Sequence, residues 1–259
     1  MELLFLFNNR APANVFSLDF FQGMCAEKCS KDYNISREEQ DAYAITSYQR
    51  AQKATKDGKF AVDIVPVVIE QQKQNQQHVV DMDEEPFSVD FEKISKLRPA
   101  FTPSGTVTAA NASSLNDGAA AMVIMSSTAA TRFRLRPLAR IIGYGEAAQQ
   151  PEDFTTTPTL AVHEALRKTK LQLQDIEYHE INEAFSVVAL ANMQLMNLDI
   201  SRVNVFGGAV ALGHPIGMSG ARIIGNLIQV LKDKDAAVGC ASICNGGGGA
   251  SAIILERLA

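Results

Sequence analysis

The stretch 240–251, CASICNGGGGAS, decides how the rest of the chain is interpreted. The residues before it, 236–243, are mostly small or apolar, which predicts a buried strand ending at Cys244. Four glycines follow almost at once, and a second apolar run over 250–255 predicts a strand that returns in the opposite direction. A thiol beside backbone without side chains suits a ligand that approaches the main chain closely. The alternative is a glycine-rich hairpin next to a buried structural cysteine.

Composition narrows the class of protein. The chain has 259 residues, 46% of them hydrophobic, which is enough to bury a large core in one or two domains. A net charge of −5 without a basic block argues against nucleic acid as a partner, and no apolar run reaches the length of a membrane span. The four cysteines are too few for a disulfide framework, and their spacing matches no standard zinc pattern. Neither a secretory or transit leader nor a peroxisomal tail is expected from the two ends.

Alternating strand and helix patterns predict an α/β layered fold with mixed strand direction at the final hairpin. A helix is expected over 36–56, because Ser36 and Glu39 form a capping box and Gly58 ends the pattern. Strands are expected at 60–69, 119–125, 137–144, 176–181, 203–206, 238–243 and 252–255, and helices at 157–170, 184–196 and 217–231. Residues 71–86 are expected to be a solvated loop, 101–118 an ordered loop, 127–135 a short link and 3–7 a strand or non-native sequence. A composition break near 130–135 predicts a domain boundary.

Three polar or reactive side chains stand at predicted strand ends: Asn182, His214 and Cys244. Sites in α/β sheets assemble from the ends of separate strands, so these three residues are expected to converge. His214 lies between a glycine and a proline before a helix, which favours function over a core histidine, whereas His179 is expected to be structural. Histidine can take a proton from a thiol, and amides can stabilise an oxyanion, so the set suits acyl chemistry. The residues alone leave hydrolase and transferase open.

At this point the motifs form a known set. NEAF (182–185), GGAVALGHPIGMSGAR (207–222) and CNGGGGAS (244–251) together resemble the thiolase family, most closely its acetyl-CoA acetyltransferases. The resemblance covers roughly residues 20–259 and includes the loop-region sequences at 38–51 and 111–120. It implies a thiolase-like layered α/β fold, with a remnant of the N-terminal domain and the loop domain at 1–130 and a complete C-terminal domain at 131–259. The implied reaction is condensation of two acetyl-CoA to acetoacetyl-CoA and CoA, or the reverse thiolytic cleavage of short 3-oxoacyl-CoA.

The resemblance also implies roles for single residues. His214 matches the histidine that activates the nucleophilic cysteine, and Cys244 matches the second cysteine, which is the acid/base. Asn182 matches the residue that holds an oxyanion-hole water with His214, and the amide of Gly246 matches a donor of the other oxyanion hole. Positions that line coenzyme A, a substrate rather than a tightly bound cofactor, are Ser113, Ala109, Phe101, Ala184 and Phe185. Positions that hold potassium in the potassium-activated members are Tyr48, Ala109, Ala110, Ala112 and Val210.

Two departures from the family pattern set further expectations. The family's nucleophilic cysteine lies in an N-terminal half that this sequence does not contain, and Cys25 matches a non-catalytic position. The usual His-Met before Gly23 is Phe21-Gln22. The chain by itself is therefore expected to lack the covalent step, and the alternative function is a non-catalytic CoA-binding subunit. A ketoacyl synthase is disfavoured because those enzymes lack a second catalytic cysteine like Cys244. By resemblance, the protein would form a homo-oligomer, a dimer or tetramer, and act in lipid metabolism, including fatty acid β-oxidation, in mitochondria, with the cytosol as the alternative.

Overall fold

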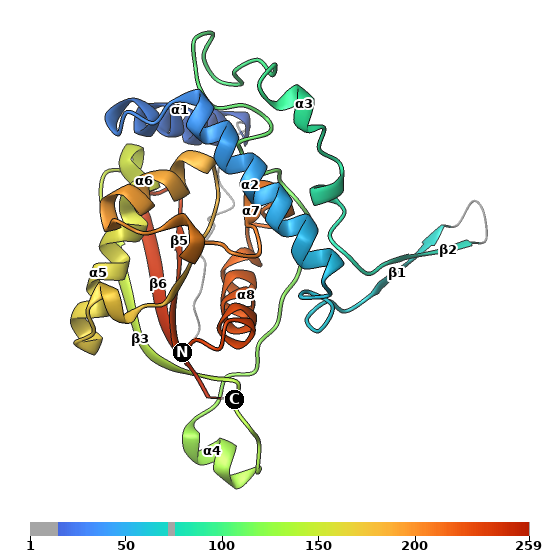
Figure 1. Cartoon of the computed structure of the whole chain (residues 1–259), viewed down its shortest axis with the longest axis vertical. Helices are drawn as coiled ribbons and strands as arrows, with labels where there is room; N and C mark the ends of the chain where they lie inside the picture. The colour runs from blue at the N-terminus through green and yellow to red at the C-terminus, as the bar shows by residue number, and fades with distance from the viewer. Residues whose placement is uncertain (1–14, 72–75, 259) are drawn as a thin grey trace.

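The computed structural model describes residues 15–71 and 76–258, and it centres on a four-stranded mixed sheet (Figure 1). The strand order is β3-β6-β5-β4. The strands are β3 (Ala139–Ala148), β4 (Tyr178–Ile181), β5 (Val238–Cys244) and β6 (Gly249–Arg257). β4 and β5 run parallel, whereas β6 is antiparallel to both β5 and β3. The expected hairpin with mixed strand direction is therefore present at the end of the chain.

Helices cover both faces of this sheet, because its strands alternate apolar side chains between the faces. α5 (Thr157–Thr169) and α6 (Ser186–Met196) pack with Cys240 and Ile254 in one buried cluster. α8 (Ser219–Asp233) packs with Ala241 and Leu255, the next residues along the same strands, in another. Figure 1 shows the helices on opposite sides of the strands. The expected helices over 157–170, 184–196 and 217–231 are confirmed within two residues at each end.

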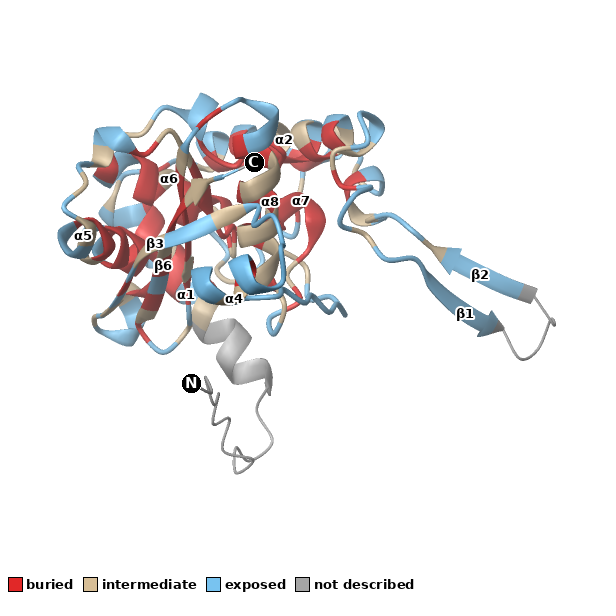
Figure 2. Ribbon diagram, turned by 90° about the horizontal axis from the view of Figure 1, so that it is seen from below, coloured by how far each residue is buried: buried red, intermediate tan, exposed pale blue. Residues whose placement is uncertain are grey.

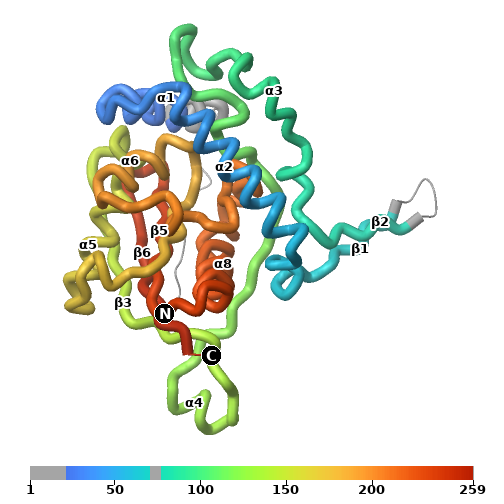
Figure 3. The backbone as a smooth tube through the Cα atoms, viewed as in Figure 1, coloured from blue at the N-terminus to red at the C-terminus, as the bar shows by residue number. Residues whose placement is uncertain are grey.

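Two helices from the first part of the chain lie across the end of the sheet at which β4 and β5 finish (Figure 3). They are α1 (Val15–Asp32) and α2 (Arg37–Lys56). The predicted capping box is confirmed: the Ser36 hydroxyl accepts from the Glu39 N–H, and the Glu39 carboxylate accepts from the Ser36 N–H. Gly58 adopts φ +71° just after the helix, a conformation that glycine takes without strain. The remaining short helices are η1 (Glu85–Phe87), α3 (Phe91–Ile94), α4 (Ser127–Arg132), η2 (Pro151–Thr156), η3 (Leu173–Asp175), η4 (Ile200–Arg202) and α7 (Ala209–Leu212).

A two-stranded hairpin, β1 (Val67–Gln71) and β2 (Gln76–Val80), projects away from the domain (Figures 1 and 2). The strand expected at 60–69 is wrong for 60–66. A turn forms at 61–63, because the Phe60 carbonyl accepts from the N–H groups of Asp63 and Ile64, and 64–66 are irregular. Of the solvated loop expected at 71–86, residues 77–85 are exposed or partly exposed, as predicted, but Pro86 is buried and the segment contains β2 and the start of η1. Residues 3–7, expected as a strand or non-native sequence, lie outside the described residues.

Three further expectations are corrected by the structure. Residues 119–125 form no strand among the described residues and are exposed, with Val123 at 87%, because no neighbouring strand covers them. Residues 203–206 contribute only a single parallel bridge, between Val203 and His179, because a tight turn at 204–207 ends the pairing. The link at 127–135 contains α4, which the Ser126 hydroxyl caps. Throughout 15–71 and 76–258, no helix is long and apolar enough to cross a membrane.

Candidate active site

The end of β4 brings Asn182 and His214 together. The Asn182 backbone N–H donates to the Ser242 carbonyl at 2.9 Å, so the chain leaves β4 alongside β5. Because β4 and β5 are parallel, their carboxyl ends share one edge of the sheet. The side-chain nitrogen Nδ2 of Asn182 lies 3.3 Å from Nε2 of His214. Two of the side chains expected at strand ends are thus in direct contact.

His214 is held by a short loop after α7. Gly213 takes φ +81°, which turns the chain, and the His214 N–H then donates to the Ser114 carbonyl (2.9 Å) and to Oδ1 of Asn116 (3.2 Å). On the ring, Nδ1 lies 2.6 Å from the hydroxyl of Ser219. Burial of the ring lowers the pKa of His214, so the imidazole is neutral and able to accept a proton at neutral pH.

Cys244 ends β5 at the same edge of the sheet and is 9% exposed. It belongs to an apolar cluster with Cys29 and Phe185. Burial raises the pKa of the Cys244 thiol to about 12, and nearby Cys29 adds to the shift. The group therefore stays protonated at neutral pH, which suits a proton donor better than a nucleophile. No hydrogen bond joins Cys244 to His214 among the described residues.

The four glycines after Cys244 form a turn organised by Asn245. Oδ1 of Asn245 accepts from the N–H groups of Gly247 (3.1 Å) and Gly249 (3.3 Å), and its carbonyl accepts from Gly248 (3.2 Å). Gly246 is the member of the four whose N–H donates no hydrogen bond within the described part of the chain. A free backbone donor beside the thiol fits the oxyanion role expected for Gly246.

The loop 101–118 contacts the segment 182–185 as well as His214. The Ser113 N–H and hydroxyl donate to the Ala184 carbonyl at 3.1 and 3.0 Å, and Ala112 forms a β-bridge with Phe185. The Phe101 ring meets the Phe185 ring edge-on, with centroids 6.3 Å apart. Four of the five residues expected to line coenzyme A are therefore neighbours. Ala109, the fifth, lies exposed in the same loop.

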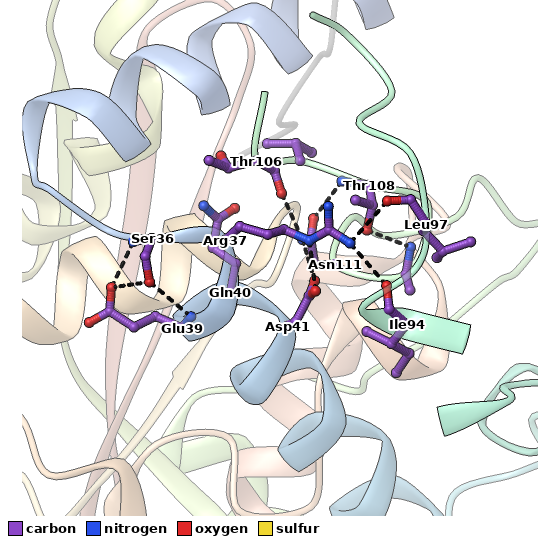
Figure 4. Close-up of polar contacts among 12 residues, drawn as sticks. Ser36, Arg37, Glu39, Gln40, Asp41, Ile94, Leu97, Thr106, Thr108 and Asn111 are labelled. Carbon is purple, nitrogen blue, oxygen red and sulfur yellow. Dashed lines mark hydrogen bonds and ion pairs between the residues drawn. The ribbon is translucent and has the colours of Figure 1, made fainter. Parts of the chain in front are cut away.

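Helix α2 anchors the middle of this loop, at Asn111 (Figure 4). The Asp41 carboxylate accepts from Arg37 Nε at 2.6 Å and from Asn111 Nδ2 at 2.9 Å. Arg37 also donates to the carbonyls of Ile94 and Leu97. The Asn111 carbonyl in turn accepts from the Ser186 N–H at the start of α6. These bonds connect α2, the loop and the NEAF segment through buried polar groups.

The residues expected to bind potassium come from three elements. Tyr48 of α2 and Val210 of α7 share one buried cluster, and Ala109, Ala110 and Ala112 follow one another in the loop. The carbonyls of Ala109 and Ala110 accept no hydrogen bond within the described ranges. Free backbone carbonyls are the ligands that potassium prefers, so the carbonyls of Ala109 and Ala110 have the chemistry that a potassium site needs. Among the described residues, no group of three His, Cys, Asp or Glu is arranged to hold a metal.

Sequence reasoning missed Glu183, the residue directly after Asn182. Its buried carboxylate accepts from Tyr43 Oη (2.8 Å), Ser47 Oγ (2.7 Å), Asn204 Nδ2 (2.9 Å) and the Val210 N–H (3.1 Å). This one carboxylate thus ties α2 and α7 to the segment that carries Asn182. An acidic residue between Asn182 and the apolar pair Ala184 and Phe185 was the available signal, because buried charges need partners. Ser219, which contacts His214, was also missed, because no local sequence pattern distinguishes it from other serines.

Fold and site together define a thiolase-like layered α/β protein. The model of the thiolase N-terminal domain matches residues 11–128, and that of the thiolase C-terminal domain matches 135–257. The chain belongs to the thiolase family, and the fold class expected from the sequence is confirmed.

Three known proteins illustrate the similarity. The mitochondrial acetyl-CoA acetyltransferase of Xenopus tropicalis is 53% identical over 92% of this chain and 56% of its own length. The cytosolic acetyl-CoA acetyltransferase of Gibberella zeae is 49% identical over 91% of this chain and 59% of its own. The crystal structure of the Acat5 thiolase of Ascaris suum in complex with coenzyme A superposes with a TM-score of 0.84, at 48% identity, over 91% of this chain and 60% of that one. The chain thus spans less than two thirds of the length of these relatives.

Proposed function

We propose that this chain carries one half of the chemistry of an acetyl-CoA acetyltransferase of the thiolase type. The reaction is the reversible condensation of two acetyl-CoA to acetoacetyl-CoA and CoA, or the thiolytic cleavage of short 3-oxoacyl-CoA. The observation that carries the proposal is the contact between Asn182 and His214 at the sheet edge where Cys244 ends β5. The names of the relatives and the coenzyme A complex of the Ascaris thiolase support the substrate class.

The geometry suggests which step these residues serve. In cleavage, the bond between C2 and C3 of the 3-oxoacyl-CoA breaks as C3 with its acyl group bonds to the acyl-accepting nucleophile, and the electron pair of the broken bond stays on C2 as an enolate of acetyl-CoA. Asn182 Nδ2 and a water held with His214 would hydrogen-bond to the enolate oxygen. Cys244 would then transfer its thiol proton to C2, and its high pKa makes the thiol the stable form before that step. Condensation runs the same steps in reverse.

The reaction also needs a nucleophile that accepts the acyl group, and the cysteines are the candidates. All four cysteines are free and buried. Burial raises the pKa of Cys25, and it raises that of Cys29 to about 11, so neither is a thiolate at neutral pH. We therefore infer that the chain alone does not turn over. The same observation favours a second candidate function, a non-catalytic subunit that binds coenzyme A.

Two measurements test these proposals. Thiolysis of acetoacetyl-CoA is followed by the loss of its absorbance, and binding of coenzyme A is followed by calorimetry. Binding without turnover supports the non-catalytic subunit and the missing covalent step. Turnover that Cys29→Ser or Cys25→Ser abolishes would show that one of these thiols is the nucleophile. Absence of both binding and turnover would contradict both functions.

We also propose potassium binding, a homo-oligomer and a cellular location, all of which the family resemblance implies. Potassium, if bound by the carbonyls near Ala109 and by Tyr48 and Val210, should raise the thermal unfolding temperature in KCl relative to NaCl at equal ionic strength. A dimer or tetramer should be seen by light scattering. We propose a mitochondrial location, with the cytosol as the alternative. A relative named as mitochondrial and one named as cytosolic have similar sequence identity to this chain, 53% and 49%. Fractionation of cells expressing the tagged protein decides between them.

A further inference from the structure

Ser219 sits directly behind the ring of His214. It is the first residue of α8 and is 1% exposed. Its hydroxyl oxygen lies 2.6 Å from Nδ1 of His214 and 3.0 Å from the carbonyl oxygen of Pro215. Both distances are within hydrogen-bond range, so the hydroxyl bridges the imidazole and the backbone of the turn that precedes α8.

Counting protons fixes the direction of these bonds. A serine hydroxyl has one proton, and the Pro215 carbonyl can only accept, so Ser219 donates to Pro215. The hydroxyl oxygen then faces Nδ1 of His214 with a lone pair, and Nδ1 must carry the ring proton. The neutral ring has one N–H, which leaves Nε2 as the bare nitrogen.

The opposite side of the ring gives an independent check. The atom nearest to Nε2 is Nδ2 of Asn182, at 3.3 Å, and an amide nitrogen only donates. An N–H on Nε2 would point a donor at a donor. Ser219 and Asn182, on two different elements, therefore demand the same tautomer.

We propose that Ser219 is a positioning residue that holds His214 in the tautomer protonated at Nδ1. Nε2 is then the basic atom, directed to the sheet edge that carries Asn182. The bond from Nδ1–H to Ser219 persists when Nε2 takes up a proton, so it also orients the imidazolium. That this matters for acyl transfer rests on the proposed function, whereas the tautomer itself does not.

The test reads the tautomer directly and needs no turnover. The chain is labelled with ¹⁵N in its four histidines, His78, His163, His179 and His214, and long-range ¹H–¹⁵N correlations distinguish the two ring nitrogens. His214→Gln assigns the resonance. We expect His214 of the unmodified chain to carry its proton on Nδ1. Ser219→Ala should shift the tautomer ratio roughly five- to tenfold toward Nε2–H, because one hydrogen bond of ordinary strength is lost. Ser219→Thr keeps a hydroxyl and should restore the ratio.

Specific results would overturn the proposal. A proton on Nε2 in the unmodified chain contradicts it even if Ser219→Ala does not fold. An unchanged ratio in a folded Ser219→Ala variant also contradicts it, and Asn182→Ala then tests whether Asn182 alone sets the tautomer. If the tautomer is as expected but the chain neither binds coenzyme A nor turns over, the proposed function fails and the positioning role stands.

Discussion

The hydroxyl of Tyr43 donates a 2.8 Å hydrogen bond to the carboxylate of Glu183, which joins helix α2 to the segment that follows β4. Both groups are buried, and 140 residues separate them in the sequence. Burial raises the pKa of Tyr43, and the neighbouring Glu183 carboxylate adds to the shift, so the phenol remains a donor at all ordinary pH values. The bond therefore holds α2 against the site and is not lost by ionisation of the phenol as the pH rises.

Tyr43→Phe is expected to destabilise the fold by about 1–3 kcal/mol, because a buried carboxylate loses one of its donors. Urea denaturation measures the change in the free energy of unfolding. Tyr144→Phe is the matched control, since Tyr144 is exposed on β3. Equal stabilities of the Tyr43 and Tyr144 variants would show that the Tyr43–Glu183 bond contributes nothing to the fold.

Glu180, on β4, is the opposite case. It is buried, and its Oε1 has no hydrogen-bond partner within the described residues. Burial, followed by repulsion from Glu183, raises the pKa of Glu180 well above that of a free carboxyl. The folded chain thus binds a proton that the unfolded chain has released at neutral pH. The contribution of Glu180 to stability is fully present below the pKa of this group in the unfolded chain, near 4.3. It is lost as the pH rises toward the pKa of Glu180 in the folded chain, by up to about 1.4 kcal/mol per pH unit.

Glu180→Gln should remove this loss. We expect the variant to be more stable than the parent at pH 8 and no more stable at pH 4, measured by denaturation at both pH values. Glu70→Gln on the exposed β1 strand serves as the control. A Glu180→Gln variant that is less stable than the parent at pH 8 would contradict the assignment of a protonated Glu180.

The glycine turn offers a matched pair of substitutions. Gly248 has φ +93°, and a Cβ there would lie 2.4 Å from the backbone oxygen of Gln149. At Gly247 the nearest atom to a Cβ would be Oδ1 of Asn245, at 3.3 Å. Gly248→Ala should therefore cost about 2 kcal/mol or more, and Gly247→Ala less than about 1 kcal/mol. Similar thermal unfolding temperatures for the two variants would be inconsistent with this conformation of the turn.

Local pattern was sufficient for most of the second half of the chain, with the exception of 203–206, which make only a single bridge. The alternation of strands and helices after 137 follows from hydrophobic period and caps, which are local properties. The same reasoning failed at 119–125. The apolar composition there predicts a buried strand, but the described part of the fold places no strand beside these residues to cover them. In the site, Asn182 could be named from its position after a strand. His214 could be named from its place between a glycine and a proline before a helix, but it follows α7 and not the strand end that the sequence predicts. Glu183 and its partners could not, because Tyr43 and Ser47 are 140 and 136 residues away and only the fold brings them together.

The exposed segment 115–125 leads to a prediction about association. Val123 is 87% and Ile124 75% exposed, and the segment runs beside α8, where Met122 approaches Gly225. Contiguous exposed apolar residues promote self-association. Val123→Ser with Ile124→Ser should lower the average mass measured by sedimentation at high concentration. Val65→Ser with Val67→Ser, near and on the projecting hairpin, is the comparison, and a decrease in that variant alone would locate the association elsewhere.

His179 should control stability in acid. It is buried, and burial, with a contribution from Arg202, lowers the pKa of His179 from 6.5 to about 4. Between these values the unfolded chain binds a proton that the folded chain does not. The contribution of neutral His179 to the free energy of unfolding is therefore fully present above pH 6.5. It falls by about 3 kcal/mol in total as the pH drops to about 4. His179→Gln should flatten this part of the curve, whereas His163→Gln, at an exposed site on α5, should leave it unchanged. Denaturation midpoints measured from pH 7 to pH 4 test the difference. A parent-like slope in the His179 variant would mean that other groups cause the acid sensitivity.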